Sequence, residues 1–340
     1  MKKKRLLIIL SVVVALFAAL GLVGLRVYSM MMRANVVTPD GGDFSLYIPT
    51  GAGFDQVKDS LYTHGLIANQ KSFEALASYK DCSDHVHPGR YVLRNGMSNN
   101  QLCNMLRGGL QTPVKVTFNN MRDVPMLAGR ISEQIEADSA SIANYLNDMQ
   151  NLAELGFTRQ TIPAMFLPNT YEFYWNCSAS QFVQKMKKEY DNFWNDERRN
   201  KAQAQGLTPV QVSTLASIVD KETNKTDEMA RIAGVYINRL KSGWLLQADP
   251  TLVFAVGDFG LKRVLNVHKE VESPYNTYKY PGLPPGPICI PSLASINAVL
   301  NAEKHNYYYF CAKDDFSGYH VFAKTLSEHN RNAEKYRRNL

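Results

Sequence analysis

Cysteine is scarce in this sequence, and its few copies are dispersed. No C-x-x-C pair occurs and no histidine stands at zinc-finger spacing, so we expect no metal site and no cofactor. Cys82 with Cys103 and Cys289 with Cys311 can pair in an oxidising compartment, whereas buried free thiols are the alternative. The five cysteines are Cys82, Cys103, Cys177, Cys289 and Cys311.

Charged residues are also few, at 20% of the 340 residues against 45% hydrophobic residues, and the net charge is +7. A disordered chain would have fewer apolar residues and a larger charge imbalance, and a transporter with many spans would have a mean hydropathy well above −0.27. The composition therefore predicts a folded protein, and its length allows about two or three domains.

One segment has no charge at all, the 20 residues of Leu6–Leu25. At ~1.5 Å per helical residue this run crosses a ~30 Å hydrocarbon layer, so we predict a transmembrane helix at residues 6–27. The basic tail at residues 1–5 predicts a cytoplasmic N-terminus with the remainder outside. The alternative is a cleaved signal peptide, but an apolar signal region is usually about 7–15 residues long, which favours an uncleaved anchor.

A strand–helix–helix–strand unit is predicted after a polar linker at residues 28–43. Apolar residues alternate over Phe44–Ile48 and again over Tyr91–Leu93, with two helical patterns between them. With the stretches "IPTGAGFDQVKDSLYTHGLI" and "GRYVLRNGMSNNQLCNMLRGG", residues 44–110 resemble a LysM-like module. That resemblance implies binding to N-acetylglucosamine-containing glycans; a small α+β domain of another purpose is the alternative.

Two further stretches are typical of a sugar-binding wall. Residues 167–175 are rich in aromatic rings, on which pyranose faces stack, although such rings are also ordinary core residues. Residues 274–291 hold six of the fifteen prolines and predict an irregular, ordered loop. Tyr275–Tyr278 in this loop are hydrogen-bonding residues without an obvious packing reason, which suits a binding surface.

A helix is predicted to begin after Thr208, which has Pro209 next to it and Gln211 at the capping-box position. Apolar residues then recur at the spacing of one buried stripe. At ~100° per residue, Glu222 projects within roughly 20° of Leu215, on the edge of that stripe. The stripe consists of Val212, Leu215, Ile218 and Val219.

The edge position of Glu222 predicts an unusual carboxyl group. Burial disfavours the ionised form and raises the pKa, which lets the group act as a general acid near neutral pH. The alternative is a last-turn residue turned to solvent. A second glycosidase carboxylate is expected about 5–9.5 Å away, but Asp220 faces about 160° away, and Asp227 and Glu228 suit the positive start of the next helix. Glu222 is therefore expected to act alone.

Six motifs follow one another within residues 215–330: "LASIVDKET", "VYINRL", "LQADPT", "SPYNTY", "GLPPGPI" and "HVFAKTLSEHN". With them the chain resembles the endolytic murein transglycosylase family, also called YceG-like. The resemblance implies a single-pass enzyme of the cell inner membrane, with an α+β fold and a catalytic domain at residues 111–340. Its partners would be peptidoglycan glycan strands and peptidoglycan synthases, not nucleic acid.

The resemblance also implies site residues. The family's catalytic glutamate falls on Glu222, and Gln247, Asp249, Asn276 and Tyr278 become substrate-binding residues of the groove. The chain departs from the family where Asp220 and Asn169 stand and in "PICIPS", and none of these departures affects the glutamate.

The implied reaction cuts nascent strands internally at the β-1,4 bond after N-acetylmuramic acid, leaves a 1,6-anhydro end and terminates elongation. We expect Glu222 to protonate the glycosidic oxygen and then to accept the proton of the sugar's own 6-hydroxyl, which closes the ring. Two alternatives remain: a non-catalytic LysM-type scaffold that tethers a membrane complex to the wall, and a true hydrolase with a second acid or base elsewhere in the fold.

Overall fold

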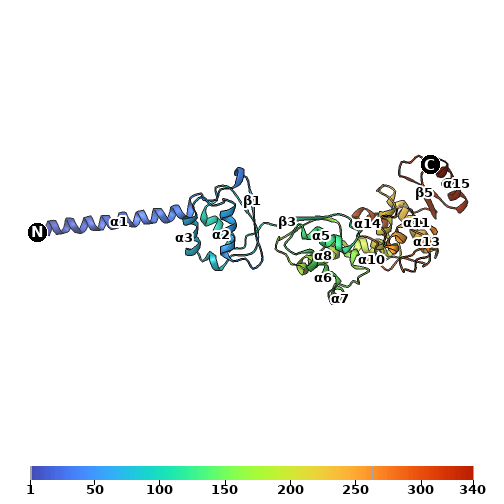
Figure 1. Ribbon diagram of the computed structural model, residues 1–340, viewed down its shortest axis with the longest axis horizontal. Helices are drawn as coiled ribbons and strands as arrows, with labels where there is room; N and C mark the ends of the chain where they lie inside the picture. The colour runs from blue at the N-terminus through green and yellow to red at the C-terminus, as the bar shows by residue number, and fades with distance from the viewer. Residues whose placement is uncertain (1, 262, 340) are drawn as a thin grey trace. The chain divides into compact units, whose positions relative to one another are not determined.

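The structure, a computed structural model, describes residues 2–261 and 263–339; Met1 and Leu340, which end the predicted tail and catalytic domain, lie outside them. Two compact units divide the chain. The first is Met1–Lys115 with Glu172–Cys177, and the second is Val116–Tyr171 with Ser178–Leu340. In the described residues the strands form three two-stranded sheets among many helices, so the predicted α+β class is confirmed (Figure 1).

The first unit begins with one long apolar helix, α1 (Lys2–Met32), drawn unbroken in Figure 1. Its segment Lys3–Met32 is long and apolar enough to cross a membrane, with a mean hydropathy of 3.1 in its most apolar window. The helix continues five residues beyond the predicted span at 6–27, into the predicted linker, where residues 28–32 contain no proline or glycine.

The rest of the first unit packs two antiparallel strands against helices. Phe44 lies opposite Leu93 and Ile48 opposite Gly89. The predicted strand–helix–helix–strand order is present, and a further helix, α4, follows it. The elements are η1 (Pro39–Gly41), β1 (Phe44–Ile48), α2 (Phe54–Thr63), α3 (Gln70–Tyr79), η2 (Cys82–Asp84), β2 (Gly89–Leu93) and α4 (Asn99–Arg107).

The five cysteines are free thiols. Cys82 and Cys103 are both buried in the core of the first unit, where the Cys82 thiol faces the Cys103 carbonyl oxygen at 3.9 Å. Cys289 is buried in the second unit, with its Sγ 3.6 Å from the Ser217 carbonyl oxygen. The sequence left disulfide pairing and free thiols as alternatives, and in the structure the cysteines are free thiols.

The second unit is mainly helical and carries the helix predicted to hold the acid. The boundary between the units falls within the paired strands β3 and β4. The elements before that helix are β3 (Val114–Phe118), α5 (Val124–Ser132), α6 (Ser139–Asn147), α7 (Met149–Leu155), η3 (Ile162–Met165), β4 (Asn169–Phe173), α8 (Ala179–Phe193) and α9 (Asp196–Ala204). The others are α10 (Pro209–Glu222), α11 (Met229–Lys241), α12 (Asp249–Val256), α13 (Asn266–Lys269), α14 (Leu293–Leu300), β5 (Tyr309–Ala312), β6 (His320–Ala323) and α15 (Leu326–Arg338).

Helix α10 begins as predicted, with a capping box between Thr208 and Gln211. The prediction that only one stripe of α10 is buried is wrong, however, because residues 212–220 are all buried. Helices α9, α11, α12 and α14 pack around α10. The buried hydroxyls are satisfied locally: Thr214 donates to the Val210 carbonyl and Ser217 to the Thr214 carbonyl. Short polar side chains thus allow a helix to be central without an apolar surface all round.

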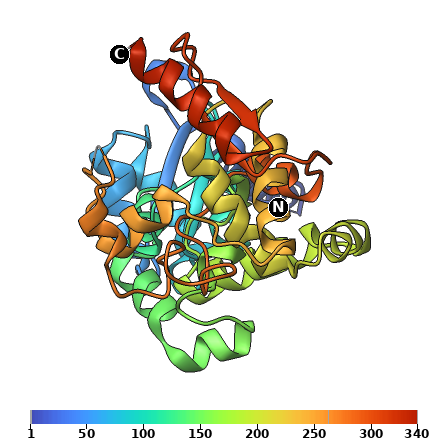
Figure 2. The same cartoon turned by 90° about the vertical axis from the view of Figure 1, so that its right-hand side faces the viewer.

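A hairpin of β5 and β6 closes the second unit toward its C-terminus. The strands are antiparallel, with Tyr309 opposite Ala323 and Ala312 opposite His320. Helix α15 lies along this hairpin, shown in red in Figure 2. None of the described α15 residues is fully buried, so α15 covers the hairpin with one partly buried face.

Candidate active site

Glu222 is the last residue of α10, and its half-buried side chain lines a cavity of about 460 Å³. The helix end fixes where the side chain points, since the capping box and Pro209 set the start of α10 and therefore its phase. Other walls come from α11, α12, the proline-rich loop, the hairpin and α15. The lining residues are Glu222, Tyr236, Arg239, Gln247, Asp249, Tyr278, Tyr309, Phe310, Cys311, Ala312, His320, Leu326 and His329.

Burial raises the pKa of Glu222 to about 7. A hydrogen bond from Tyr236 opposes this shift, the negative charge of Asp249 adds to it, and the positive charge of Arg239 opposes it. The Tyr236 hydroxyl donates to Glu222 Oε1 at 2.6 Å. A carboxyl group with this pKa holds a proton about half of the time near pH 7, so it can both give and take one.

Tyr236 and Arg239 reach the cavity from α11. Burial and the adjacent Glu222 raise the pKa of Tyr236 well above its usual value, so its hydroxyl remains a donor. Arg239 is 8% exposed and is held by two carbonyl groups, since Nε donates to Tyr308 O at 2.7 Å and Nη1 donates to Leu246 O at 2.5 Å. Its charge is therefore fixed in place beside the acid.

Asp249 and Tyr278 form a second polar pair in the same cavity. The Tyr278 hydroxyl donates to Asp249 Oδ1 at 2.5 Å, and burial together with this bond raises the pKa of Tyr278. Asp249 opens α12 without capping it, because Ala248 occupies the cap position and no side chain caps the helix. The Asp249 carboxylate is bound to Tyr278 instead.

Gln247 and Asn276, the other two predicted groove residues, differ in placement. Gln247 lines the cavity from a left-handed backbone with φ of +48°, an uncommon conformation for a residue other than glycine. Asn276 is completely buried and does not line the cavity. Its amide donates to the carbonyl oxygens of Lys269 and Val271, and its Oδ1 accepts from the backbone N–H of Tyr278. Asn276 therefore shapes the loop that presents Tyr278.

The wall formed by the hairpin and α15 was not predicted, although His320, Leu326 and His329 belong to the "HVFAKTLSEHN" motif. His320 is fixed by Glu228, whose carboxylate accepts from the His320 backbone N–H at 3.0 Å and contacts His320 Nδ1 at 3.1 Å. Glu228 is 5% exposed and occupies the N-cap position of α11, at the helix start where we had expected a favourable charge, but its side chain does not cap the helix. The spacing of residues in the sequence does not indicate that this motif lies near Glu222.

His329 is the one cavity-lining side chain with a buried, unused polar atom. In the described part of the chain its Nδ1 has no hydrogen-bond partner. Burial, together with the charges of Arg239 and Arg337, lowers the pKa of His329, so the ring is neutral near pH 7. It stacks on Tyr309 with ring centroids 5.4 Å apart. A neutral imidazole of this kind can exchange hydrogen bonds with a hydroxyl-rich ligand.

Asp220 does not line the cavity, in agreement with the direction predicted for it. Its carboxylate is 9% exposed and accepts from Asn120 Nδ2 at 2.9 Å and from Ser292 Oγ at 2.5 Å. Ser292 also caps α14. Asp220 therefore ties α10 to the start of α14, at the end of the "PICIPS" stretch.

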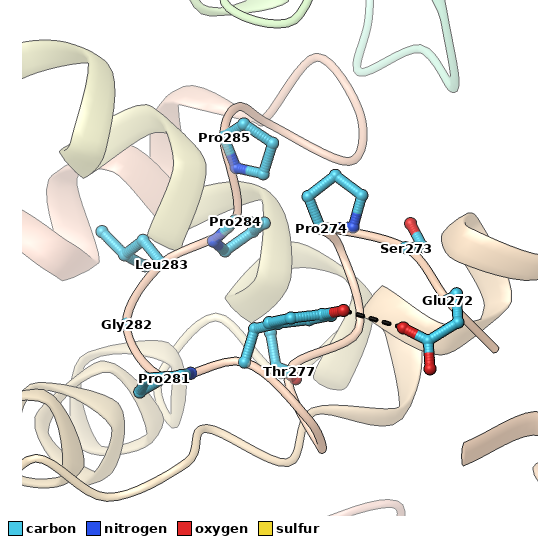
Figure 3. A pocket seen from close by; sticks show the side chains of 10 residues that line it. Glu272, Ser273, Pro274, Thr277, Pro281, Gly282, Leu283, Pro284 and Pro285 are labelled. Atoms are coloured by element: carbon cyan, nitrogen blue, oxygen red, sulfur yellow. Dashed lines mark hydrogen bonds between the residues drawn. The ribbon is translucent and has the colours of Figure 1, made fainter. Parts of the chain in front are cut away.

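The two predicted binding walls are placed differently. None of residues 167–175 lines the Glu222 cavity. The loop at 274–291 contributes Tyr278 to it and also walls a second hollow of about 550 Å³, in which Tyr280 donates to Glu272 Oε2 at 2.8 Å. Figure 3 shows Pro274, Pro284 and Pro285 around this hollow. Proline rings supply rigid apolar surface there.

No cluster of three or more His, Cys, Asp or Glu side chains that could hold a metal occurs in residues 2–261 and 263–339.

Curated proteins similar to this chain include two that carry the same name, endolytic murein transglycosylase. The endolytic murein transglycosylase of Bacillus subtilis (strain 168) is 28% identical over 307 residues, which are 86% of this chain and 84% of that protein. The endolytic murein transglycosylase of Streptococcus pneumoniae (serotype 2, strain D39) is 27% identical over 319 residues, which are 85% of this chain but 57% of that longer protein.

A crystal structure of a YceG-like protein from Listeria monocytogenes matches with a TM-score of 0.56 and 27% identity, over 85% of this chain and 98% of that one. The profile of the YceG-like family matches residues 46–335, which include every lining residue of the Glu222 cavity. The chain therefore belongs to the YceG-like family.

Proposed function

We propose that this protein is a peptidoglycan lytic transglycosylase whose catalytic residue is Glu222. The names of its relatives, endolytic murein transglycosylases, support the substrate class. The observation that carries the residue assignment is the half-buried Glu222 carboxyl in a cavity, with its pKa raised to about 7 and bonded to Tyr236. The proposed catalytic domain is residues 111–340.

The proposed reaction breaks the β-1,4 bond between N-acetylmuramic acid and N-acetylglucosamine. Protonated Glu222 gives its proton to the glycosidic oxygen as positive charge develops at the anomeric carbon of the muramic residue. The carboxylate that results takes the proton of that residue's 6-hydroxyl, whose oxygen bonds to the anomeric carbon. No water is consumed, and the 1,6-anhydro end forms because the nucleophile belongs to the same sugar.

The remaining polar residues of the cavity suit substrate binding. Gln247 and His329 offer hydrogen-bonding atoms to sugar hydroxyls and acetamido groups, while Tyr309 offers a ring face. The proposed contribution of Asn276 is indirect, through the loop that carries Tyr278.

A hydrolase is the second candidate, and one observation favours it: Asp249 lines the same cavity as Glu222. A second carboxylate there could activate water, as in ordinary glycosidases. One observation opposes this role: Asp249 Oδ1 already accepts a hydrogen bond from the Tyr278 hydroxyl. The products distinguish the two reactions, because hydrolysis leaves a reducing end about 18 mass units heavier than the anhydro end.

Digestion of purified peptidoglycan sacculi by the full chain tests the proposal. We expect mass spectrometry to find anhydro-ended fragments cut from within strands, rather than single units released from strand ends. Fragments that carry only reducing ends would show a hydrolase. If Asp249→Asn then stops the reaction as completely as Glu222→Gln, the two-carboxylate mechanism replaces the proposed one.

The Tyr236→Phe variant tests how the acid is tuned. The Tyr236 hydrogen bond favours ionised Glu222 and lowers its pKa, so its removal raises that pKa further. Because the first step needs protonated Glu222, the high-pH limb of the rate profile should move upward by about one pH unit. Tyr309→Phe is the matched control and should leave the limb unmoved. A downward shift, or none, in Tyr236→Phe contradicts the assigned role.

We further propose that α1 anchors the protein in the cell inner membrane with its N-terminus in the cytoplasm, so that both units lie outside. The basic residues before the apolar run support this orientation. In this setting the enzyme cuts nascent strands and terminates their elongation beside peptidoglycan synthases. The LysM-like role of residues 44–110 in glycan binding belongs to the same proposal.

A further inference from the structure

A hollow of about 480 Å³ lies in the first unit at the C-terminal end of α1, far along the chain from Glu222. One side is formed by Arg26, Ser29 and Arg33. Their spacing of three and four residues places them on one face of the helix end. We call this cavity the arginine hollow. The opposite side comes from the first turns of α3 and α4.

The charge of the arginine hollow is not compensated. Its lining contains Arg26 and Arg33 but no aspartate or glutamate. Within the described residues, no ion pair involves either guanidinium, and the last turns of α1 contain no acidic residue. Two arginines that face the same cavity without a carboxylate are suited to an anion, and a guanidinium binds phosphate oxygens with paired N–H donors.

The wall that faces the arginines is a rigid network of amide and hydroxyl groups. Asn99 is 1% exposed; its Oδ1 accepts from Asn35 at 2.6 Å, and its Nδ2 donates to Ser72 Oγ and to the Met30 carbonyl, each at 3.1 Å. Asn35 Oδ1 in turn accepts from the backbone N–H of Asn69 at 2.7 Å. This network fixes the end of α1 to α3 and α4. The arginine hollow therefore has a preformed polar wall beside its two cations.

The position along α1 indicates where such an anion would be. Arg26 directly follows the uncharged run Leu6–Leu25, and Arg33 lies about 10 Å further along the helix axis at ~1.5 Å per residue. The polar headgroup layer adds roughly 5–8 Å on each side of the hydrocarbon core. If α1 spans the bilayer, the Arg26 side of the hollow therefore lies at headgroup depth and Arg33 lies a few ångströms beyond that layer, whichever side of the membrane the hollow faces.

We propose that the arginine hollow binds the phosphate headgroup of an anionic membrane lipid, with Arg26 and Arg33 as its cationic ligands. This proposal rests on the anchoring of α1 and is independent of the reaction at Glu222. A bound headgroup holds the end of α1, and with it the first unit, at the bilayer surface. The arginines outside the membrane then have a role that orientation of the helix does not give them.

The test uses the full chain in detergent, with retained lipid measured by native mass spectrometry. Phosphatidylglycerol and phosphatidylcholine with the same acyl chains are the probes. We expect preferential retention of phosphatidylglycerol, reduced about tenfold in the Arg26→Gln/Arg33→Gln variant. The matched control is Arg94→Gln/Arg107→Gln, which removes two exposed arginines of the same unit outside the hollow and should retain the lipid.

A second variant avoids any loss of arginine. Ser29→Glu places a carboxylate three and four residues from the two arginines, where it pairs with them and repels phosphate. Ser29 is exposed, so folding should tolerate the change. We expect Ser29→Glu to lose phosphatidylglycerol and the uncharged Ser29→Gln to keep it.

Three outcomes overturn the proposal. Equal retention of the two lipids by the unmodified chain, or unchanged retention in both arginine-directed variants, removes the headgroup site. Displacement of the lipid by millimolar inorganic phosphate, with no preference left for the lipid, assigns the hollow to free phosphate. Incorporation into phosphatidylcholine nanodiscs is measured separately: a chain that does not incorporate overturns the anchor and this proposal together, while the murein reaction of the same sample reports on Glu222 alone.

Discussion

The Glu222→Gln variant is expected to cut peptidoglycan strands about 10²- to 10⁴-fold more slowly than the unmodified protein, while its binding to glycan strands changes little. Glutamine has nearly the same volume, and its amide oxygen can accept the Tyr236 hydrogen bond that now reaches Glu222 Oε1. It cannot donate a proton of suitable acidity or accept one. Binding contacts from Gln247, Tyr309 and the loop should remain.

The control for this variant is Asp220→Asn, an equal carboxyl-to-amide change two residues earlier in α10. Asp220 lies outside the cavity and binds Asn120 and Ser292, so its replacement should affect stability more than the rate. Thermal unfolding of both variants shows whether a lost rate is a lost fold. Strand cutting by Glu222→Gln at the rate of the unmodified protein would remove Glu222 from the catalytic role, whereas no cutting by either protein would leave only the scaffold interpretation of the chain.

The Gly234→Ala substitution should lower the free energy of unfolding by about 1–3 kcal/mol and should also remove most of the activity. Gly234 lies inside α11, where a Cβ atom would clash with the Glu303 carbonyl oxygen and lie 2.6 Å from His305 Nε2. The segment at residues 303–305 is bonded to α11, because the Glu303 backbone N–H donates to the Ala230 carbonyl oxygen at 3.0 Å. Neither partner can withdraw without breaking hydrogen bonds, so the helix must shift, and Tyr236 shifts with it.

Gly129→Ala is the matched control, since Gly129 is also a helix residue but has no atom within 4 Å of a Cβ added to it. Alanine there should raise the free energy of unfolding by up to about 1 kcal/mol through helix propensity. Denaturant unfolding of the two variants should therefore give changes of opposite sign. Equal changes would show that the close approach of α11 to residues 303–305 does not limit stability.

The direction of the Glu222 side chain could be predicted because it follows from one helix. Thr208 and Pro209 mark where α10 begins, and the rotation of ~100° per residue then sets the direction of Glu222 relative to Leu215. A side chain at the end of that helix must lie at the border of its packing. No tertiary contact was needed for this argument, and the cavity position and raised pKa of Glu222 agree with it.

The surroundings of the acid could not be predicted, because they depend on distant segments. Ser213 and Ser217 of α10 are polar, yet both are completely buried because other helices cover every side of α10. Asn276 has the chemistry of a ligand-binding residue, but its amide holds the loop backbone instead. His320 and His329 lie about a hundred residues after Glu222, and no local pattern indicates that the hairpin turns them toward it.

Titration of the Glu222 carboxyl itself tests most directly whether this group can act as the proton donor. In the full chain labelled with carboxyl-¹³C glutamate, the signal absent from Glu222→Gln identifies this group by NMR. We predict a midpoint near pH 7, because burial opposes the negative charge of the carboxylate. A midpoint near the ordinary glutamate value of about 4.3 would contradict it, since the group would then be ionised at neutral pH and could not act first as the proton donor.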